Sequence, residues 1–470
     1  MKRFYILILL VLSFSCISYA QFGSGGAVNT KSTGMAKTSN AISDGVYAIG
    51  INPANLMNDE NYSAQLVTLL PIPQISFRGG TSFMSINDIN YYFGGVNGQP
   101  RYLTDADKQR FSSLFQNGGF TAINANVNIL SVSYKSNDKI GAFGFSVNDV
   151  AAGKFTLPQA LVDFALNGNP LGKSYNLNDA QAKAWWIRDY SISYARNLNL
   201  LKNFFDQLSA GVSIKLVDGF VYTGTEKVNT TLTTATDYTI NGNADFKAVS
   251  AFSNNFGVKY DFDSTEQTSN FSPFPSPAGS GLGVDLGFSA KRKYWRFALA
   301  VTDIGSINWN ENTAQFMASG NIKVDDITNK DQIDSLRDKI TGKAKPISSF
   351  TTSLPTTLRL GAAYFFDKQH NPIPGTLLLA FDYNQGFNDM PGNSVNPRVS
   401  IGAEWKPMDW IPYIRTGLSF GGNFGFHWGF GLGVNTGVLE LEIATSDLQT
   451  FLAPNASEYL SVALGSRWRF

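Results

Sequence analysis

The chain has 470 residues, a formal net charge of +1 and 16% charged residues, below the roughly one quarter that is usual in soluble domains. This near-neutral balance excludes a strong electrostatic attraction to nucleic acid, and no nucleic-acid partner is expected. Glycine and phenylalanine are abundant, at 44 and 36 residues, and the length allows one large domain or two ordinary ones.

The first residues, MKRFYILILLVLSFSCISYAQ, have the pattern of a secretory signal peptide. Lys2 and Arg3 precede an apolar stretch, and Ser18-Tyr19-Ala20 supplies a small-x-small cleavage site, so we predict a signal peptide at residues 1–20. Cys16 offers an alternative, lipoprotein processing, although a phenylalanine two residues before it fits that pathway badly. No run of about 18 apolar residues follows, so no transmembrane helix is predicted.

Residues 21–60 precede the first predicted strand and contain AIGINPANL, residues 48–56. This stretch resembles the A-x-x-x-NPA-x-L signature of long-chain fatty-acid transporter-like outer-membrane barrels, which include hydrocarbon-uptake channels and secretion-associated barrels of Bacteroidetes. TDIGSINWN, residues 302–310, is similar to a strand-end motif of uncharacterised barrels from that phylum. The resemblance implies that residues 21–60 form a hatch inside a barrel, with Asn52, Pro53, Ala54 and Leu56 as its motif. The alternative is that NPANL is only the turn that leads into the first strand.

Beyond residue 60, apolar residues alternate with small or polar ones at the two-residue period of a β-strand. In FGFHWGFGLGV, residues 424–434, every second residue is large and apolar, and the residues between are glycine or His427. Comparable runs occur at residues 61–70, 74–86, 123–134, 141–148, 185–195, 207–216, 281–291, 294–301, 357–366, 376–384, 398–406, 413–420, 438–444 and 459–470. The run at 123–134 changes phase near Ile129, which predicts a β-bulge. About 14 strands are expected.

The second face of these strands carries Gly, Ser, Asn and isolated charges rather than the Lys, Glu and Thr of a soluble sandwich's outer face. A barrel in lipid needs this inversion, with apolar residues outward and polar residues toward the lumen. We therefore predict an all-β fold, a transmembrane antiparallel β-barrel with an N-terminal hatch segment, with the barrel at residues 61–470. The alternative is a large secreted β protein.

The predicted connections differ in length. Short turns are expected at residues 289–293 and 406–410, and long polar loops at 218–280 and 304–355. Residues 157–169 predict a short helix, and residues 325–343 a second one. Short turns are typical of the periplasmic side of such barrels and long loops of the outer side.

Charged side chains recur on the lumen face of the C-terminal strands. The lumen candidates are Arg359, Asp382, Glu404, Arg415, His427, Glu440, Glu442 and Arg467. Their mixed signs predict cross-strand pairs that fill the barrel, and the alternative is a polar path or a carboxylate-binding spot on Arg359, Arg415 or Arg467. Gly425, Gly429, Gly431 and Gly433 leave room for a hatch or a ligand, and this wall is the predicted substrate path.

Catalytic and metal-binding patterns are not evident in the sequence. The two histidines, His370 and His427, have no neighbouring His or Cys at a metal-binding spacing, and no Ser/His/Asp arrangement or phosphate-binding glycine loop is recognisable. We therefore expect neither an enzyme nor a cofactor or metal. An outer-membrane enzyme is the weakest of the alternatives.

The C-terminus, YLSVALGSRWRF, ends on an aromatic residue with a second aromatic two positions earlier. Gly465, Trp468 and Phe470 resemble the signal by which outer-membrane barrels are recognised for assembly, which implies the barrel-assembly machinery and outer-membrane lipid as partners. The resemblance favours a passive channel for small hydrophobic molecules in the outer membrane of a Gram-negative bacterium of the Bacteroidetes. The alternative is a scaffold or shuttle that works with secretion-system proteins.

Overall fold

The computed structural model describes residues 29–58, 62–116, 118–258, 272–325, 330–332, 343–366, 373–408, 410–422 and 425–470. The predicted signal peptide, His370, Phe424 and most of the helix expected at 325–343 lie outside the described residues. No helix in the described ranges is long and apolar enough to cross a membrane.

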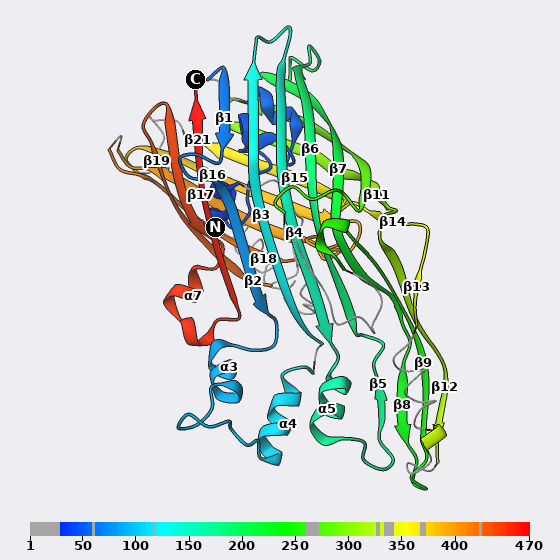
Figure 1. The fold of residues 1–470 in the computed structure, drawn as a ribbon. Coiled ribbons are helices and arrows are strands. Elements are labelled where there is room, and N and C mark those ends of the chain that lie inside the picture. Colours follow the sequence, from blue (N-terminus) through cyan, green and yellow to red (C-terminus); the bar gives the residue numbers. More distant parts are fainter. Residues whose placement is uncertain are drawn as a thin grey trace.

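The described strands close into a 14-strand antiparallel barrel (Figure 1), so the predicted fold class is confirmed. In order around the barrel the strands are β1 (Ala64–Thr68) with β2 (Gln74–Thr81), β3 (Gly119–Lys135), β4 (Ala142–Leu157), β6 (Gln181–Asn197), β7 (Gln207–Val228), β10 (Gly279–Arg292), β11 (Trp295–Trp309), β14 (Phe350–Ser353) with β15 (Thr357–Phe365), β16 (Thr376–Gly386), β17 (Arg398–Lys406), β18 (Tyr413–Gly421), β19 (His427–Asn435), β20 (Leu439–Thr445) and β21 (Tyr459–Arg469).

The barrel closes where the first strand meets the last. β1 and β2 both pair with β21 on one side and with β3 on the other, so they form one strand interrupted at residues 69–73. The backbone N–H of Phe470 donates to the carbonyl of Ala64 at 2.8 Å, and its carbonyl accepts from the N–H of Ser63 at 2.9 Å. The last residue therefore completes the ladder and leaves no open edge there.

The strand faces follow the predicted alternation. Ile192 on β6 and Ile214 on β7 are opposite each other and are 68% and 57% exposed on the outer wall. Their neighbours Ser193 and Ser213 are buried inside, where the two hydroxyls are 2.7 Å apart. The register of β3 shifts between Asn128 and Leu130, which confirms the bulge predicted near Ile129.

A charge on the outer wall tests which face meets lipid. Replacing Ile192 by arginine should lower the free energy of unfolding from lipid vesicles by about 2–4 kcal/mol, because the guanidinium would enter hydrocarbon. Leu201→Arg, in the exposed turn between β6 and β7, is the matched control and should change stability by less than about 0.5 kcal/mol. Equal effects of the two substitutions would mean that Ile192 does not face the bilayer core.

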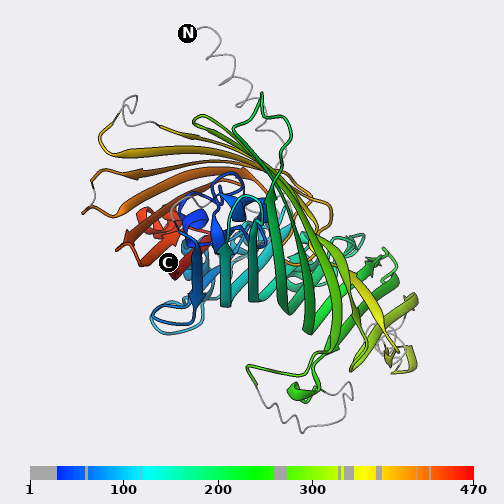
Figure 2. The same cartoon turned by 90° about the horizontal axis from the view of Figure 1, so that it is seen from above.

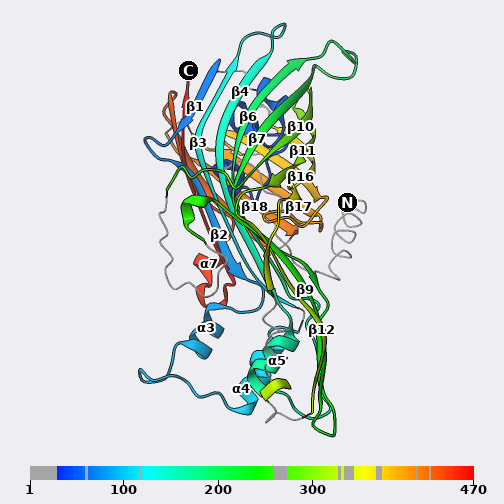
Figure 3. The same ribbon diagram turned by 45° about the vertical axis from the view of Figure 1, so that its right-hand side comes forward.

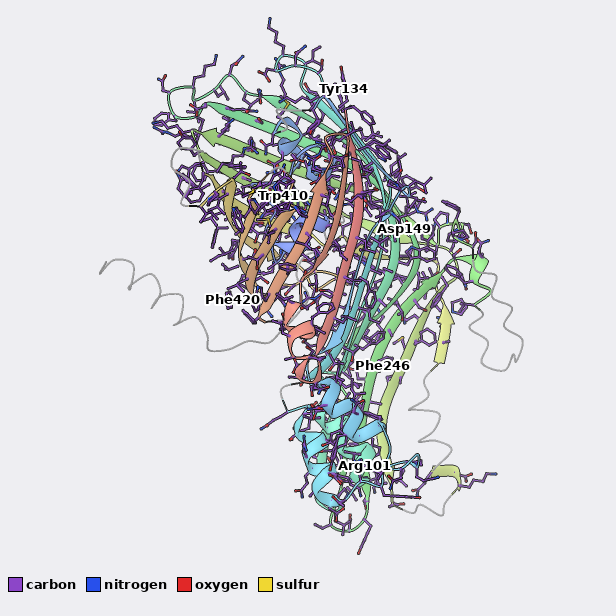
Figure 4. All side chains as sticks on the ribbon, turned by 90° about the vertical axis from the view of Figure 1, so that its left-hand side faces the viewer. Arg101, Tyr134, Asp149, Phe246, Trp410 and Phe420 are labelled. Atoms are coloured by element: carbon purple, nitrogen blue, oxygen red, sulfur yellow. The ribbon has the colours of Figure 1, made fainter. Side chains whose placement is uncertain are left out.

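The two ends of the barrel differ, as the connections predict. At the short-turn end lie the C-terminus, the turn between β10 and β11, and the aromatic side chains Tyr134 and Trp410, which Figure 4 labels. The opposite end, here the long-loop end, carries α3 (Ile86–Phe93), α4 (Asp105–Ser113) and α5 (Gln159–Asn167), with Arg101 beside them (Figure 4). The helix predicted at 157–169 is thus present as α5. Three shorter helices, η3 (Asn254–Phe256), α7 (Leu448–Leu452) and η4 (Pro454–Ala456), lie in other connections.

The long connections are not loops, and this expectation was wrong. A β-extension continues the sheet beyond the barrel (Figure 3), made of the end of β7 with β5 (Ser174–Asn176), β8 (Thr231–Thr234), β9 (Ile240–Phe252), β12 (Thr313–Val324) and β13 (Lys343–Pro346). β9 and β12 pair over their whole length, from Ile240 opposite Val324 to Ala251 opposite Thr313. The apolar residues that alternate here are small or few, such as Ala314 and Phe316 on β12, and β9 buries Val249 and Ala251 in an apolar cluster. The alternation is therefore weaker than in the barrel strands, and the sequence pattern indicates a polar loop.

Candidate functional site

The barrel lumen is occupied by the hatch, defined here as residues 29–58, which the view along the barrel in Figure 2 shows in blue inside the ring of strands. Its helices are α2 (Thr30–Gly34), η1 (Gly45–Ala48) and η2 (Pro53–Met57). Nearly every hatch residue is buried. The hatch is therefore packed against the wall, and its side chains fill much of the barrel.

The NPA motif joins the hatch to the wall. Asn52 caps η2, since its side-chain oxygen accepts from the N–H of Ala54 at 3.0 Å, and Pro53 occupies the first helical position, where a missing N–H costs nothing. The amide nitrogen of Asn52 donates to the carbonyl of Phe288 on β10 at 3.0 Å. Ala54 and Leu56 are buried. The motif thus lies between hatch and wall, and not in a turn into β1.

Glycines on the lumen face make room for the hatch backbone. A Cβ at Gly429 would lie 2.5 Å from the backbone nitrogen of Ala36, and one at Gly431 would lie 3.1 Å from the Cα of Gly34. Of the two predicted occupants of this space, a hatch or a ligand, the structure places the hatch there, and the substrate path along this wall stays a prediction. A Cβ at Gly425, which has a φ of +68°, would have no atom within 4 Å, so this residue does not contribute to the hatch contact.

A buried ion-pair network joins the C-terminal strands to the hatch. Arg415 donates to Glu404 at 2.6 Å and to Glu442 at 2.5 Å, and lies 3.4 Å from Glu440. Lys31 of the hatch is 2.8 Å from Glu404. The side chains of Arg415, Glu440 and Glu442 are at most 2% exposed, so these charges are neutralised by one another and not by water.

Arg467 on β21 extends this network to a second part of the hatch. It pairs with Glu440 at 2.6 Å and with Asp44 of the hatch, and its guanidinium lies 4.0 Å from the ring centre of Tyr47. The Tyr47 hydroxyl donates to Glu442 at 2.9 Å. Arg415 and Arg467 are thus engaged by acidic partners, which favours the ladder interpretation over a carboxylate-binding spot.

The remaining lumen candidates lie in three other places. Asp382 accepts from the backbone N–H groups of Ser39 and Asn40 at 2.6 and 2.9 Å, so it too holds the hatch. His427 is 2.9 Å from Asp447 and contacts Arg78, near the long-loop end of β19. Arg359 is buried on β15, and its Nε donates to Thr302 at 3.2 Å. The structure therefore does not gather the eight candidates into one site.

The C-terminal residues lie at the closing strand. Gly465 is buried, and a Cβ there would lie 3.0 Å from the hydroxyl of Thr30 in the hatch. Trp468 donates to the carbonyl of Leu70 at 3.3 Å, and Phe470 is 59% exposed at the short-turn end.

A partly open cavity of about 50 Å³ lies between the hatch and the wall. Its lining is mainly apolar with a few polar groups, and the residues are Gly50, Asn126, Asn148, Val150, Trp185, Ile187, Asp189, Lys215, Val217, Asp303, Leu354, Pro355, Pro391 and Gly392. Two connections at the long-loop end, at residues 354–356 and 387–397, supply the last four and are here called the lid. Beyond the lid, Tyr222, Trp309 and Met390 belong to an apolar cluster that shares Trp185 and Leu354 with the cavity.

A family described as a family of unknown function, DUF5723, matches residues 53–446. The chain belongs to this family. A comparison with curated proteins gives no match. Among solved structures, the chain is similar to the TodX deltaS2S3 mutant monoaromatic hydrocarbon channel, at 12% identity over 95% of this chain and 99% of that chain, with a TM-score of 0.49. It is also similar to a Pseudomonas aeruginosa FadL homologue (13% identity, 96% and 100% covered, TM-score 0.46) and to the Pseudomonas putida toluene transporter TodX (10%, 96% and 100%, TM-score 0.44).

Sequence reasoning missed the charged group beside the cavity of this DUF5723 barrel. Lys215 lies 3.0 Å from Asp285 and 2.6 Å from Asp303, and Asp189 lies on the neighbouring strand β6. The alternation in GLGVDLGF placed Asp285 on the lumen face, which was a usable signal. The sequence pattern gave no such signal for Asp303, because this residue lies at an irregularity of β11, where its φ is +59°.

Lys37 lies in the hatch just after α2, and the pKa of its ammonium group differs from the ordinary value. Burial inside the barrel, together with the charges of Arg398, Arg78 and Arg359, lowers the pKa of Lys37 to about 7 from its ordinary 10.5, and Asp447 opposes this shift. A released hatch would regain the ordinary pKa, so docking releases a proton between about pH 7 and pH 10.5. Docking should therefore strengthen as pH rises through this window and stay constant below it.

A spin label attached at position 29 through Asn29→Cys measures this dependence. Its mobile fraction should fall as the pH rises from 7 to 10, and Lys37→Met should abolish most of the change. An unchanged pH profile in Lys37→Met would assign the titration to another group.

Proposed function

We propose that this protein is a passive channel of the outer membrane for small, mainly apolar molecules, with the hatch as its closing element. The observation that carries the proposal is the partly open cavity between hatch and lid, which has the mainly apolar lining with few polar groups that small-molecule sites share. Its volume of about 50 Å³ is far below the roughly 300 Å³ of the smallest such sites, so passage needs a wider path than this closed form offers. The outward apolar band of the barrel supports a position in the membrane, and the C-terminal residues Gly465, Trp468 and Phe470 support recognition by the assembly machinery.

Passage through this barrel requires the hatch to move. The hatch is held to the wall by Lys31–Glu404, by Arg467–Asp44 and by the backbone bonds to Asp382. These contacts are polar and buried, so release of the hatch must bring in water that hydrates the separated charges. A closed resting state that opens transiently fits this arrangement.

A reversible crosslink between hatch and wall tests the gating role. The side chains of Lys31 and Glu404 meet at 2.8 Å, so Lys31→Cys with Glu404→Cys brings two thiols within reach of a short bis-methanethiosulfonate, which oxidises both to disulfides. In vesicles that contain the double variant, oxidation should reduce entry of an apolar fluorescent probe by at least about tenfold, since the hatch can no longer leave. Reduction with dithiothreitol should restore entry.

The two single cysteine variants control for the substitutions themselves. Entry that is equal in the oxidised and reduced double variant would show that the hatch does not gate the path. If the probe enters vesicles that contain the native protein no faster than it enters empty vesicles, the channel function is ruled out.

The alternative function, a scaffold in secretion or surface assembly, would need a partner surface outside the barrel, and the β-extension is the place to test for one. β9 and β12 form an ordered ribbon outside the barrel, and Met317 on β12 is 46% exposed. A photo-reactive amino acid at position 317 should trap a partner protein in intact cells if the scaffold role is correct. No adduct at position 317, together with probe entry through the native barrel, would leave the channel as the function.

A further inference from the structure

The cavity between hatch and lid has an acidic polar side. Of its lining residues, Asp189 and Asp303 are acidic and Lys215 is the only base. Lys215 is already shared, because its ammonium is 2.6 Å from Asp303 and 3.0 Å from Asp285, which lies behind the lining. Arg359 interacts electrostatically with Asp285 and Asp303 from β15. Three carboxylates against two cations leave one negative charge in this part of the lumen.

Asp189 has no cation of its own, because Lys215, which attracts it electrostatically, is held in ion pairs by Asp285 and Asp303. Its Oδ1 accepts from Ser191 at 3.0 Å and from the Asn148 amide at 3.3 Å, and within the described part of the chain it forms no ion pair. Both donors are neutral, so they orient the carboxylate without cancelling its charge. A carboxylate held this way at a cavity wall favours a positively charged ligand group.

Two further lining groups have unused hydrogen-bonding capacity. Trp185 is 3% exposed and its indole Nε1 has no partner, and Asn126 is 7% exposed with a side-chain oxygen that also lacks one. Buried polar groups are normally satisfied, so these atoms point to an occupant of the cavity. Asn126 supplies a second acceptor for an N–H donor, and the indole face of Trp185 attracts cations.

We propose that the cavity binds the ammonium group of a small organic amine, with Asp189 as the counter-ion and Asn126 and Trp185 as further contacts. This inference rests on the proposed channel function and names the substrate class that the channel favours. Val150, Ile187 and Leu354 surround the stem of the ligand, which extends toward the lid. A volume of about 50 Å³ accepts an ammonium group with a short stem and not a long chain. A carboxylate ligand would face the uncompensated charge of Asp189 and is disfavoured.

Three small compounds of similar size distinguish the effect of ligand charge on binding from that of ligand hydrophobicity. Propylamine is a cation at pH 7, propionate an anion and 1-propanol neutral, and each is titrated calorimetrically into the purified full chain in a non-ionic detergent. The amine should bind at least about tenfold more tightly than the other two. Asp189→Asn should weaken amine binding about tenfold and leave 1-propanol within twofold, whereas Asp179→Asn, an equal charge change in an exposed turn, should alter neither.

The outcomes separate this inference from the channel itself. Equal binding of propylamine and 1-propanol, unaffected by Asp189→Asn, would overturn the amine site while hatch-dependent probe entry would still support the channel. Tighter binding of propionate, or no binding of the amine, would also overturn it. Because the three compounds are compared on the native protein, the inference stays testable even if Asp189→Asn fails to fold. Failure of the channel would appear separately, as the absence of probe entry in the vesicle assay.

Discussion

Gly429→Leu is expected to expel the hatch from the barrel. A Cβ at this position would lie 2.5 Å from the nitrogen of Ala36 and 2.9 Å from the carbonyl oxygens of Thr33 and Gly34, all of them backbone atoms that cannot rotate away. Overpacking of this kind costs about 3 kcal/mol or more, which corresponds to roughly a hundredfold loss in the docking equilibrium. Trypsin cleavage at Lys31 should therefore accelerate by about two orders of magnitude.

The matched control is Gly153→Leu on β4. A Cβ there would be 3.3 Å from the side chain of Ala184 and 3.5 Å from the ring of Phe155, away from the hatch. Cleavage at Lys31 should stay at the native rate in this variant, and both variants should keep the folded barrel's heat-dependent shift on a denaturing gel. A slow, native-like cleavage rate in Gly429→Leu would mean that hatch and wall are not in contact at Gly429.

Arg415→Met should destabilise the whole barrel more than any single change on its surface. The substitution keeps the apolar stem but removes the charge that Glu404, Glu440 and Glu442 share. Leaving buried carboxylates without their partner costs about 3–5 kcal/mol, and the effect should be visible in equilibrium urea unfolding from vesicles. Adding Glu442→Gln should recover part of the loss, since the removed carboxylate no longer needs compensation.

Arg110→Met is the control for the loss of an arginine as such. Arg110 lies 3.4 Å from Asp88 at the long-loop end, and its side chain is 59% exposed, so this pair is worth less than about 1 kcal/mol. A similar loss in Arg110→Met and Arg415→Met would show that the lumen network contributes no more than a surface pair.

Several parts of the molecule followed from local pattern alone. The period of two in β6 and β7 fixed which residues face outward, because a strand in lipid must be apolar on one side and must place its polar residues on the other. The phase change near Ile129 identified the bulge of β3 for the same reason. The helix α5 and the short turn between β10 and β11 were also readable, since each is determined by neighbours in the chain.

The contacts that define the candidate site could not be read this way. Lys31 and Glu404 are 373 positions apart, and Asp189 meets the lid only because the hatch closes the cavity from the other side. The β-extension was missed because the alternation in strands such as β9 and β12 depends on Ala, Gly and a few larger residues, and it is obscured by the Asn, Asp and Thr around it.

The sequence by itself therefore determined the barrel, its approximate strand number and the inward set of charges, because each of these depends on the local alternation that lipid imposes. Only the tertiary structure decided that the glycines of β19 accommodate the hatch, that Arg415 and Arg467 are paired with acidic residues, and that Asp189 must share Lys215 with two other carboxylates. The physical reason is that pairing and packing inside a closed barrel depend on which distant residues reach the same height of the lumen. That height is set by strand register and closure, and no short stretch of sequence records it.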